Sequence, residues 1–231
     1  MIGIMCAMRE ELEPILEKVE IKNVIEYAKN NYYMAQFGKL DLVLAYSKIG
    51  KVNASTTASI LIEKFKAQKI LFSGVAGAIE KDLKIGDLII ATKTTQHDVD
   101  LTVFGYEPGF IPESKIFFEC DKHLNDLAKT VAKKLGIKLK EGIIASGDQF
   151  IHNKEKKEWI AKTFKASAIE MEGGAVGCVT WTLDVPFFML RAISDTAQEG
   201  AGVDFDEFLE KSSEVSAKFL IEMLRQMENE K

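Results

Sequence analysis

Carboxylate side chains follow apolar segments at three separate places in this sequence. A buried carboxylate is costly unless it is paired or used, and carboxyl groups held in different environments can act as a general acid and a general base. We therefore expect these side chains to carry any chemistry that the chain performs. The residues are Glu11, Glu170, Glu172 and Asp195.

Glu11, Glu170 and Glu172 also have structural interpretations. Pro14 is tolerated only near the start of a helix, so Glu11 lies near a helix N-terminus, where a carboxylate can cap the helix or interact with its dipole. In an extended segment Glu170 and Glu172 project to one face and Met171 to the other. The two glutamates could then form structural salt bridges or bind a ligand, and the sequence leaves both interpretations open.

Two further segments could bring a ligand close to the backbone. Ser73 to Ala78 contains glycines directly after a predicted strand, and we expect a turn in which Ala76 and Gly77 allow close approach. A plain tight turn is the alternative, since the spacing is neither a dinucleotide fingerprint nor a phosphate-binding loop. Ser146 to Ile151 follows another apolar run, and Phe150 offers a face on which a base could stack.

Other catalytic chemistries lack candidates. The histidines His97, His123 and His152 are scattered without a metal-ligand spacing, so we expect no metal site. The 3 cysteines contain no CxxC pair, which argues against a zinc ribbon and a disulfide framework. No GxSxG elbow or cysteine–histidine motif suggests acyl transfer.

The elements that must position these groups are short apolar strands separated by longer helices. The spacing predicts helices over Leu124 to Leu135, closed by Gly136, and over Asp206 to Glu228. This alternation predicts an α/β fold with a central mixed sheet, helices on both faces, and a site at the carboxyl ends of strands. His97 to Lys115 is expected to be a long loop. The predicted strands are Ile2 to Met5, Leu42 to Tyr46, Ile70 to Phe72, Leu88 to Ala91, Ile143 to Ala145 and Phe187 to Ile193.

Composition limits the domain organisation and the partners. The chain has 231 residues, 47% of them hydrophobic, and no linker or internal repeat, so we expect a single domain over residues 1–231. A formal charge of −5 disfavours nucleic acid and acidic membranes as partners. No apolar run approaches the roughly 20 residues that span a bilayer, and the first residues do not form a signal peptide. We expect a cytoplasmic protein.

Five motifs occur in a fixed order and together cover nearly the whole chain. They are Gly3 to Glu11 (GIMCAMREE), Ser47 to Val52 (SKIGKV), Ser146 to Asp148 (SGD), Glu170 to Glu172 (EME) and Arg191 to Asp195 (RAISD), followed by Phe205 to Phe208 (FDEF). In this order they resemble the 5′-methylthioadenosine/S-adenosylhomocysteine nucleosidases. The resemblance implies a purine nucleoside phosphorylase-like three-layer αβα fold, a homodimer, and hydrolysis of adenine nucleosides without a metal or organic cofactor.

The resemblance also implies roles for individual residues. Asp195 matches the general acid that protonates adenine at N7, Glu11 the residue that activates water, and Glu172 the one that binds the ribose hydroxyls. The other expected substrate-site residues are Phe150 and Ile151 at the base, Met171 beneath the sugar, Arg191 beside the water, Met8, Ile49 and Phe205 around the 5′-alkylthio group, and Ala76, Gly77 and Glu170. Leu101, Phe104 and Pro112 match loop positions that include contributions from the partner subunit.

One position departs from the family pattern, because many members carry serine where this chain has Val75. With Gln149 and His152 nearby, the chain resembles the branch that also acts on 6-amino-6-deoxyfutalosine in menaquinone synthesis; 5′-deoxyadenosine is a further candidate substrate. Two other functions stay open, a nucleoside phosphorylase on the same fold and a nucleoside sensor without turnover. Glu10 and Glu11 would repel a phosphate from the N-terminal segment, which favours hydrolysis.

Overall fold

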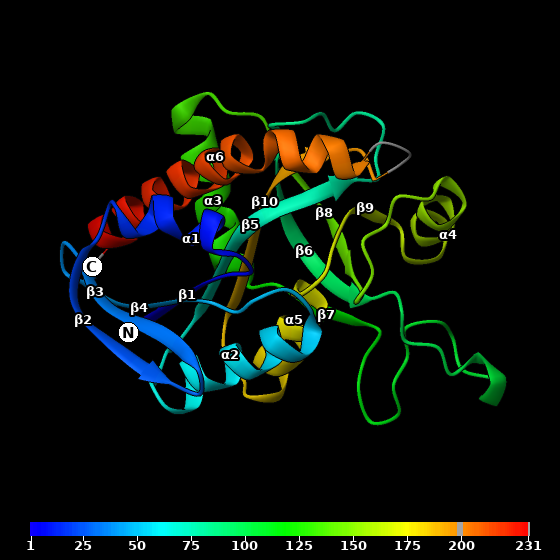
Figure 1. The fold of residues 1–231 in the computed structure, drawn as a ribbon, viewed down its shortest axis with the longest axis horizontal. Helices are drawn as coiled ribbons and strands as arrows, with labels where there is room; N and C mark the ends of the chain where they lie inside the picture. Colours follow the sequence, from blue (N-terminus) through cyan, green and yellow to red (C-terminus); the bar gives the residue numbers. More distant parts are fainter. Residues whose placement is uncertain (198–200, 231) are drawn as a thin grey trace.

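The computed structural model describes residues 1–197 and 201–230, and in this range ten strands form one mixed sheet (Figure 1). The strand order is β10-β6-β8-β9-β5-β1-β4-β3-β2, with β7 paired to β6. The strands are β1 (Ile2–Cys6), β2 (Glu20–Tyr27), β3 (Asn30–Phe37), β4 (Leu40–Tyr46), β5 (Ile70–Ala78), β6 (Leu88–Gln96), β7 (Phe117–Glu119), β8 (Leu139–Ser146), β9 (Ala166–Glu170) and β10 (Phe187–Asp195). The helices are α1 (Arg9–Leu16), α2 (Lys51–Glu63), α3 (Lys122–Leu135), α4 (Lys154–Phe164), α5 (Gly173–Thr182) and α6 (Ala201–Asn229).

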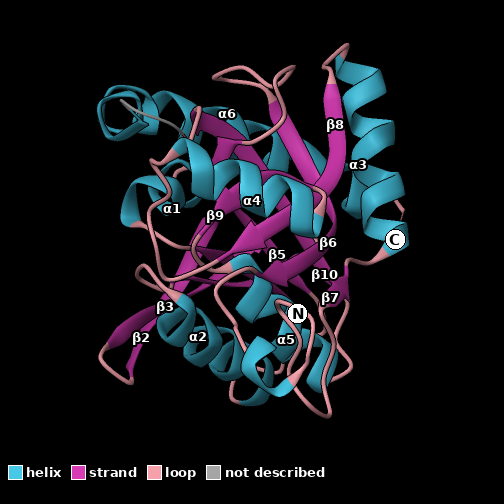
Figure 2. Cartoon of the chain, turned by 90° about the vertical axis from the view of Figure 1, so that its right-hand side faces the viewer, coloured by secondary structure: helices cyan, strands magenta, loops and turns pink. Residues whose placement is uncertain are grey.

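Two groups of helices cover opposite faces of the sheet, which gives the expected three-layer αβα architecture. Helices α1, α3 and α6 lie on one side in Figure 1, and their apolar residues share one core cluster with β1, β4 and β10. Helices α2 and α5 lie on the other side and share a second cluster. Figure 2 views the molecule from the side of α4, which crosses in front of β9 and packs on it.

Part of the sheet closes on itself. Strand β10 pairs with β5 on one side and with β6 on the other. Strand β6 pairs with β8, β8 with β9, and β9 with β5, so these five strands form a ring. The β5–β9 pairing joins only Gly77 to Ile169 and Ala78 to Ala168, at the ends of both strands. The carboxyl ends of β5, β9 and β10 therefore converge on one place.

All six strands predicted from apolar runs are present, and β5 corrects one expectation. Ser73 to Ala78 is not a turn but the second half of β5, because β10 pairs with it from Ser73 to Gly77. The β2–β3 hairpin was not predicted; strand β2 is mostly exposed, and half of its residues are polar. Ala28 and Lys29 turn this hairpin with φ of 51° and 58°, without the Asn-Gly or Asp-Gly signal that such turns favour.

The other predicted elements are present with shifted boundaries. Helix α3 ends at Gly136, whose φ of 66° lies in the left-handed region that suits glycine. The C-terminal helix begins at Ala201, earlier than expected, because the sequence pattern showed only its apolar part. The segment 97–116 is irregular apart from the short 3₁₀ helix η1 (Thr102–Phe104). None of the helices in the described ranges is long and apolar enough to cross a membrane.

Candidate active site

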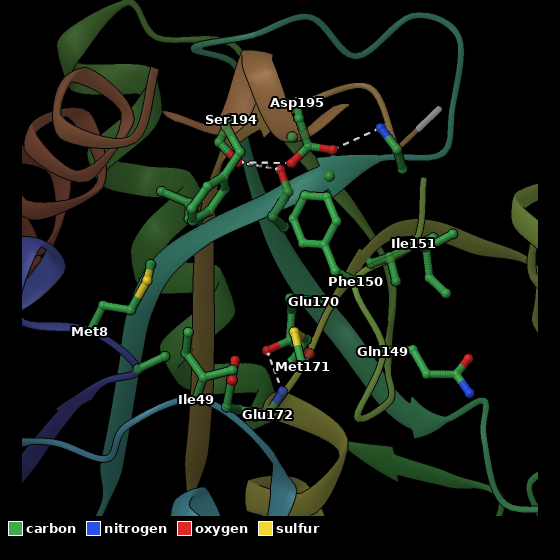
Figure 3. A pocket seen from close by; sticks show the side chains of 18 of the residues that line it. Met8, Ile49, Gln149, Phe150, Ile151, Glu170, Met171, Glu172, Ser194 and Asp195 are labelled. Carbon is green, nitrogen blue, oxygen red and sulfur yellow. Dashed lines mark hydrogen bonds between the residues drawn. The ribbon is translucent and has the colours of Figure 1, made fainter. Parts of the chain in front are cut away.

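A cavity of about 470 Å³ lies where β1, β5, β8, β9 and β10 end (Figure 3). It carries polar groups on a largely apolar wall, as small-molecule sites usually do. Its lining consists of Ala7, Met8, Glu11, Ile49, Val75, Ala76, Gly77, Gln149, Phe150, Ile151, Ile169, Glu170, Met171, Glu172, Ser194, Asp195, Ala197, Gly202, Phe205 and Asp206. Among these described lining residues are five carboxylates and no lysine, arginine or histidine.

Glu11 lies at the third position of helix α1 and both caps the helix and lines the cavity. Its Oε2 accepts hydrogen bonds from the Ala7 and Met8 N–H groups at 2.8 and 2.9 Å. Its Oε1 accepts the Val75 N–H of β5 at 2.9 Å. Burial raises the pKa of Glu11, while Arg191 and the three N–H donors act in the opposite direction. The structural and functional interpretations of Glu11 are therefore compatible.

Two glycines of β5 make room for carboxylates from other elements. A Cβ atom at Gly74 would lie 2.4 Å from Glu11 Oε1, and one at Gly77 would lie 2.6 Å from Asp195 Oδ1. Both distances are far below van der Waals contact, so any larger residue would displace the acid beside it. The structure therefore shows that these glycines admit protein side chains; Gly77 also lines the cavity, where the expected close approach of a ligand stays a prediction.

Glu170 ends β9 and forms a buried ion pair with Arg191 of β10. Arg191 Nη2 donates to Glu170 Oε2 at 2.9 Å, and the guanidinium stacks on the Phe72 ring, 4.0 Å from its centroid. The same carboxylate accepts the Gly173 N–H at 2.8 Å and the Ser146 hydroxyl. Glu170 therefore joins β8, β10 and the start of α5, which supports the salt-bridge interpretation of this residue.

The chain leaves the extended conformation after Glu170, and this corrects the expected alternation. Glu172 has φ −137° and ψ −41° and immediately precedes α5. Because the backbone turns here, Met171 lines the same cavity as Glu170 and Glu172 instead of pointing to the opposite face.

Glu172 is held by a backbone group from a distant part of the chain. Its Oε1 accepts the Gly50 N–H at 2.8 Å, directly before α2. Burial, followed by the neighbouring Glu170 carboxylate, raises the pKa of Glu172 to about 8. Gly50 has φ 98°, so the N–H reaches this position through a conformation that favours glycine. Gly50 belongs to the motif Ser47 to Val52, but its contact with Glu172 was not predicted.

Asp195 is buried at the end of β10, across the cavity from Glu172 (Figure 3). The Ala197 N–H donates to its Oδ1 at 2.7 Å, and the Ser194 hydroxyl donates to its Oδ2 at 3.1 Å. Both donors lie within two residues of Asp195 in sequence. Ser194 and Ala197 also line the cavity, and sequence reasoning gave neither of them a role although both neighbour Asp195.

Aromatic and aliphatic side chains form the remaining walls. Phe150 packs edge-to-face on Phe205, with ring centroids 5.7 Å apart. Phe150 and Ile49 keep 42% and 51% of their surface exposed, so both stand at the mouth where a ligand could cover them. Met8 and Ile151 complete the apolar lining among the predicted residues.

A polar network outside the cavity lining joins the segments that carry these walls. Lys51 Nζ forms an ion pair with Asp98 Oδ1 at 2.6 Å, and the two side chains are only 17% and 14% exposed. Asp98 Oδ2 accepts the Asp148 N–H, and Asp148 Oδ1 accepts the Lys51 N–H. Lys51 follows Gly50, and Asp148 precedes Phe150 by two residues. The network therefore fixes the Glu172 contact and the aromatic wall relative to each other.

Most predicted site residues meet in this cavity, and four do not line it. Arg191 is 1% exposed and lies beneath the carboxylates, paired with Glu170. Leu101, Phe104 and Pro112 lie in the segment 97–116, which extends away from the body at the right of Figure 1. Phe104 is 73% exposed in this chain.

Known proteins resemble this chain over nearly its full length. The Phosphorylase superfamily pattern matches residues 1–225. The aminodeoxyfutalosine nucleosidase of Campylobacter jejuni is 51% identical, covering 98% of this chain and 99% of that protein. The 5′-methylthioadenosine/S-adenosylhomocysteine nucleosidase of Staphylococcus carnosus is 39% identical, covering 98% and 100%. The Helicobacter pylori enzyme with the latter name, solved with butyl-thio-DADMe-Immucillin-A, is 52% identical with a TM-score of 0.96, covering 97% of each chain.

Proposed function

We propose that this chain, which belongs to the phosphorylase superfamily and within it to the 5′-methylthioadenosine/S-adenosylhomocysteine nucleosidases, hydrolyses adenine nucleosides to free adenine. The substrates are 5′-methylthioadenosine, S-adenosylhomocysteine, 6-amino-6-deoxyfutalosine and 5′-deoxyadenosine. These reactions would serve methionine salvage and menaquinone synthesis. The name of the Campylobacter jejuni relative supports the futalosine derivative.

The observation that carries this proposal is a cavity with carboxylates on opposite walls and no cation in its described lining. Breaking an N-glycosidic bond builds positive charge on the sugar and negative charge on the leaving base. An ionised carboxylate stabilises the positive charge on the sugar, and a protonated carboxyl group neutralises the leaving base by giving it a proton. A phosphorylase would need cationic groups for its phosphate, and the described lining offers repulsion instead.

Glu11 is suited to activate the water. Burial raises its pKa, which makes the carboxylate a better base, while its three N–H donors favour the ionised form. The water oxygen attacks the anomeric carbon and its proton passes to Glu11. The Val75 N–H makes this contact whatever its side chain, so the backbone supports Glu11 without the hydroxyl found in many relatives.

Asp195 is suited to protonate the leaving base. As the bond between the anomeric carbon and N9 breaks, its electron pair moves into adenine, and a proton from Asp195 goes to N7. Phe150 and Ile151 would hold the base against this acid, since both line the same cavity. Glu172 would form hydrogen bonds with the ribose hydroxyls, and Arg191 neutralises Glu170 through their buried ion pair.

The substrate is tested by adenine release in phosphate-free buffer. We expect turnover of methylthioadenosine, adenosylhomocysteine and aminodeoxyfutalosine, at rates that rank the fit of groups beyond C5′. Adding phosphate should change neither the rate nor the sugar product. Turnover that requires phosphate and yields a ribose 1-phosphate analogue would show a phosphorylase instead.

The sensor alternative is tested by variants of the two acids. Glu11→Gln and Asp195→Asn should abolish adenine release while methylthioadenosine still binds, because both changes keep the side-chain shape. Glu10→Gln is the matched control, since Glu10 is exposed and does not line the cavity. A wild-type protein that binds these nucleosides and never hydrolyses them would be a sensor.

Exposed apolar side chains on α2 and in the segment 97–116 support a homodimer. Val52, Val103 and Phe104 are 76%, 84% and 73% exposed, and a second copy of the chain could bury them. Leu101 and Pro112 lie in the same segment as Phe104, and a second copy covering them would bring apolar groups toward the 5′ end of the substrate. Sedimentation equilibrium tests the dimer.

We further propose a single domain and a cytoplasmic location.

A further inference from the structure

The turn that follows Asp195 is strained. Ala197 has φ 49°, in the left-handed region that residues other than glycine generally avoid because their Cβ crowds the backbone. This conformation directs the Ala197 N–H to Asp195 Oδ1 at 2.7 Å. The hydrogen bond that orients the Asp195 carboxyl group thus depends on an unfavourable backbone conformation at Ala197. Neighbouring groups must therefore stabilise that conformation.

Helix α4 supplies those groups. Lys157 Nζ donates to the Thr196 carbonyl oxygen at 2.7 Å, at the centre of the turn. Ala197 is 1% exposed and shares an apolar cluster with Ile160 of α4 and with Ile151. The helix therefore contacts both the strained turn and the segment that lines the base side of the cavity.

The charge of Lys157 also lies close to Asp195. Burial lowers the pKa of the half-buried Lys157, and the Asp195 carboxylate is the main influence that raises it. A cation at this position stabilises the carboxylate that remains after Asp195 has given its proton to the base.

We propose that Lys157 is a positioning residue for Asp195: its bond to the Thr196 carbonyl holds the Asp195–Ala197 turn in the conformation that orients the acid. The inference rests on the proposed function for its effect on rate. It adds a residue outside the cavity lining to the groups that control protonation of the base.

The test compares Lys157→Met with Lys157→Arg and with Lys154→Met. Lys154 is the matched control because it lies on the same helix with its side chain 81% exposed. We expect Lys157→Met to lower kcat for methylthioadenosine about tenfold, the loss typical of one charge-assisted hydrogen bond. KM should stay within about twofold, because the ribose and 5′ contacts are unchanged. Lys157→Arg keeps a donor and a charge and should recover most of kcat, and Lys154→Met should match the wild type.

A second readout does not depend on turnover. Amide hydrogen exchange at Ala197 should be about tenfold faster in Lys157→Met than in the wild type and unchanged in Lys154→Met. Wild-type protein without adenine release would refute the proposed function, and the exchange rates would still decide the role of Lys157. The proposal is overturned by unchanged exchange in Lys157→Met, by a kcat within twofold of the wild type, by no recovery in Lys157→Arg, or by an equal loss in Lys154→Met.

Discussion

The raised pKa of Glu172 makes the stability of this protein depend on pH, and Glu172→Gln isolates that dependence. The carboxyl group titrates near pH 8 in the folded chain and near its ordinary value of 4.5 when unfolded. A group with a higher pKa in the folded state takes up a proton on folding between those two values. Its stabilising contribution is therefore complete below about pH 4.5 and is lost as the pH rises through about 8.

The magnitude follows from the linkage slope of about 1.4 kcal/mol per pH unit for one proton. Between pH 6 and pH 8 the folded wild type approaches its own pKa, so the loss is about 2 kcal/mol. Glutamine has no proton to lose and keeps a similar shape. The free energy of unfolding of Glu172→Gln, relative to the wild type, should therefore rise by about 2 kcal/mol from pH 6 to pH 8.

Urea unfolding at pH 6, 7 and 8 measures this difference directly. Because both proteins keep Glu11 and Glu170, the contributions of those groups largely cancel in the comparison. Glu210→Gln on α6 is the control, since its carboxyl is exposed, and its curve should parallel the wild type. Parallel curves for Glu172→Gln and the wild type would refute the reasoning that burial and Glu170 hold a proton on this side chain.

Three further changes test the construction of the site. Gly74→Ala puts a Cβ 2.4 Å from Glu11 Oε1, so it should lower kcat about a hundredfold, with at most about 1–3 kcal/mol lost in urea unfolding; unchanged adenine release would contradict this. Arg191→Met leaves the Glu170 carboxylate buried without its cation and should cost about 3–5 kcal/mol of unfolding free energy, part of which Glu170→Gln should restore. Phe104→Ala should weaken dimerisation in sedimentation equilibrium and raise KM about tenfold. If Phe104 packs against no second copy, both quantities will stay at their wild-type values.

Local sequence patterns predicted the elements whose signal lies within a few residues. The apolar runs in β1, β4, β5, β6, β8 and β10 are continuous because successive residues within each run are buried or partly buried, whichever face of the sheet they point to. Strand β2 was missed because polar residues interrupt its sequence, EIKNVIEY, so that no continuous apolar run marks it, and in the structure the strand is almost entirely exposed. Its hairpin turn at Ala28 and Lys29 contains no glycine or asparagine, the residues whose presence would predict positive φ values.

The glycines of β5 show where local reasoning failed. Two glycines after an apolar run predict a turn, yet Gly74 and Gly77 lie inside strand β5. The lack of a side chain at Gly74 and Gly77 leaves space for Glu11 and Asp195, which lie 63 and 118 positions away in the chain, respectively. No window of sequence contains both partners, so only the folded chain reveals the reason for these glycines.

The sequence by itself determined six of the ten described strands, the helices α1, α3 and α6, the acids that could do the chemistry, and the family that carries them. Residue types and spacing are enough for this, because each motif is local. Tertiary structure alone decided that Glu170 pairs with Arg191, that Gly50 holds Glu172, and that Lys157 reaches the turn after Asp195. These contacts join residues that are distant in the chain, and they form where the ends of strands β5, β9 and β10 meet the segments before α2 and on α4.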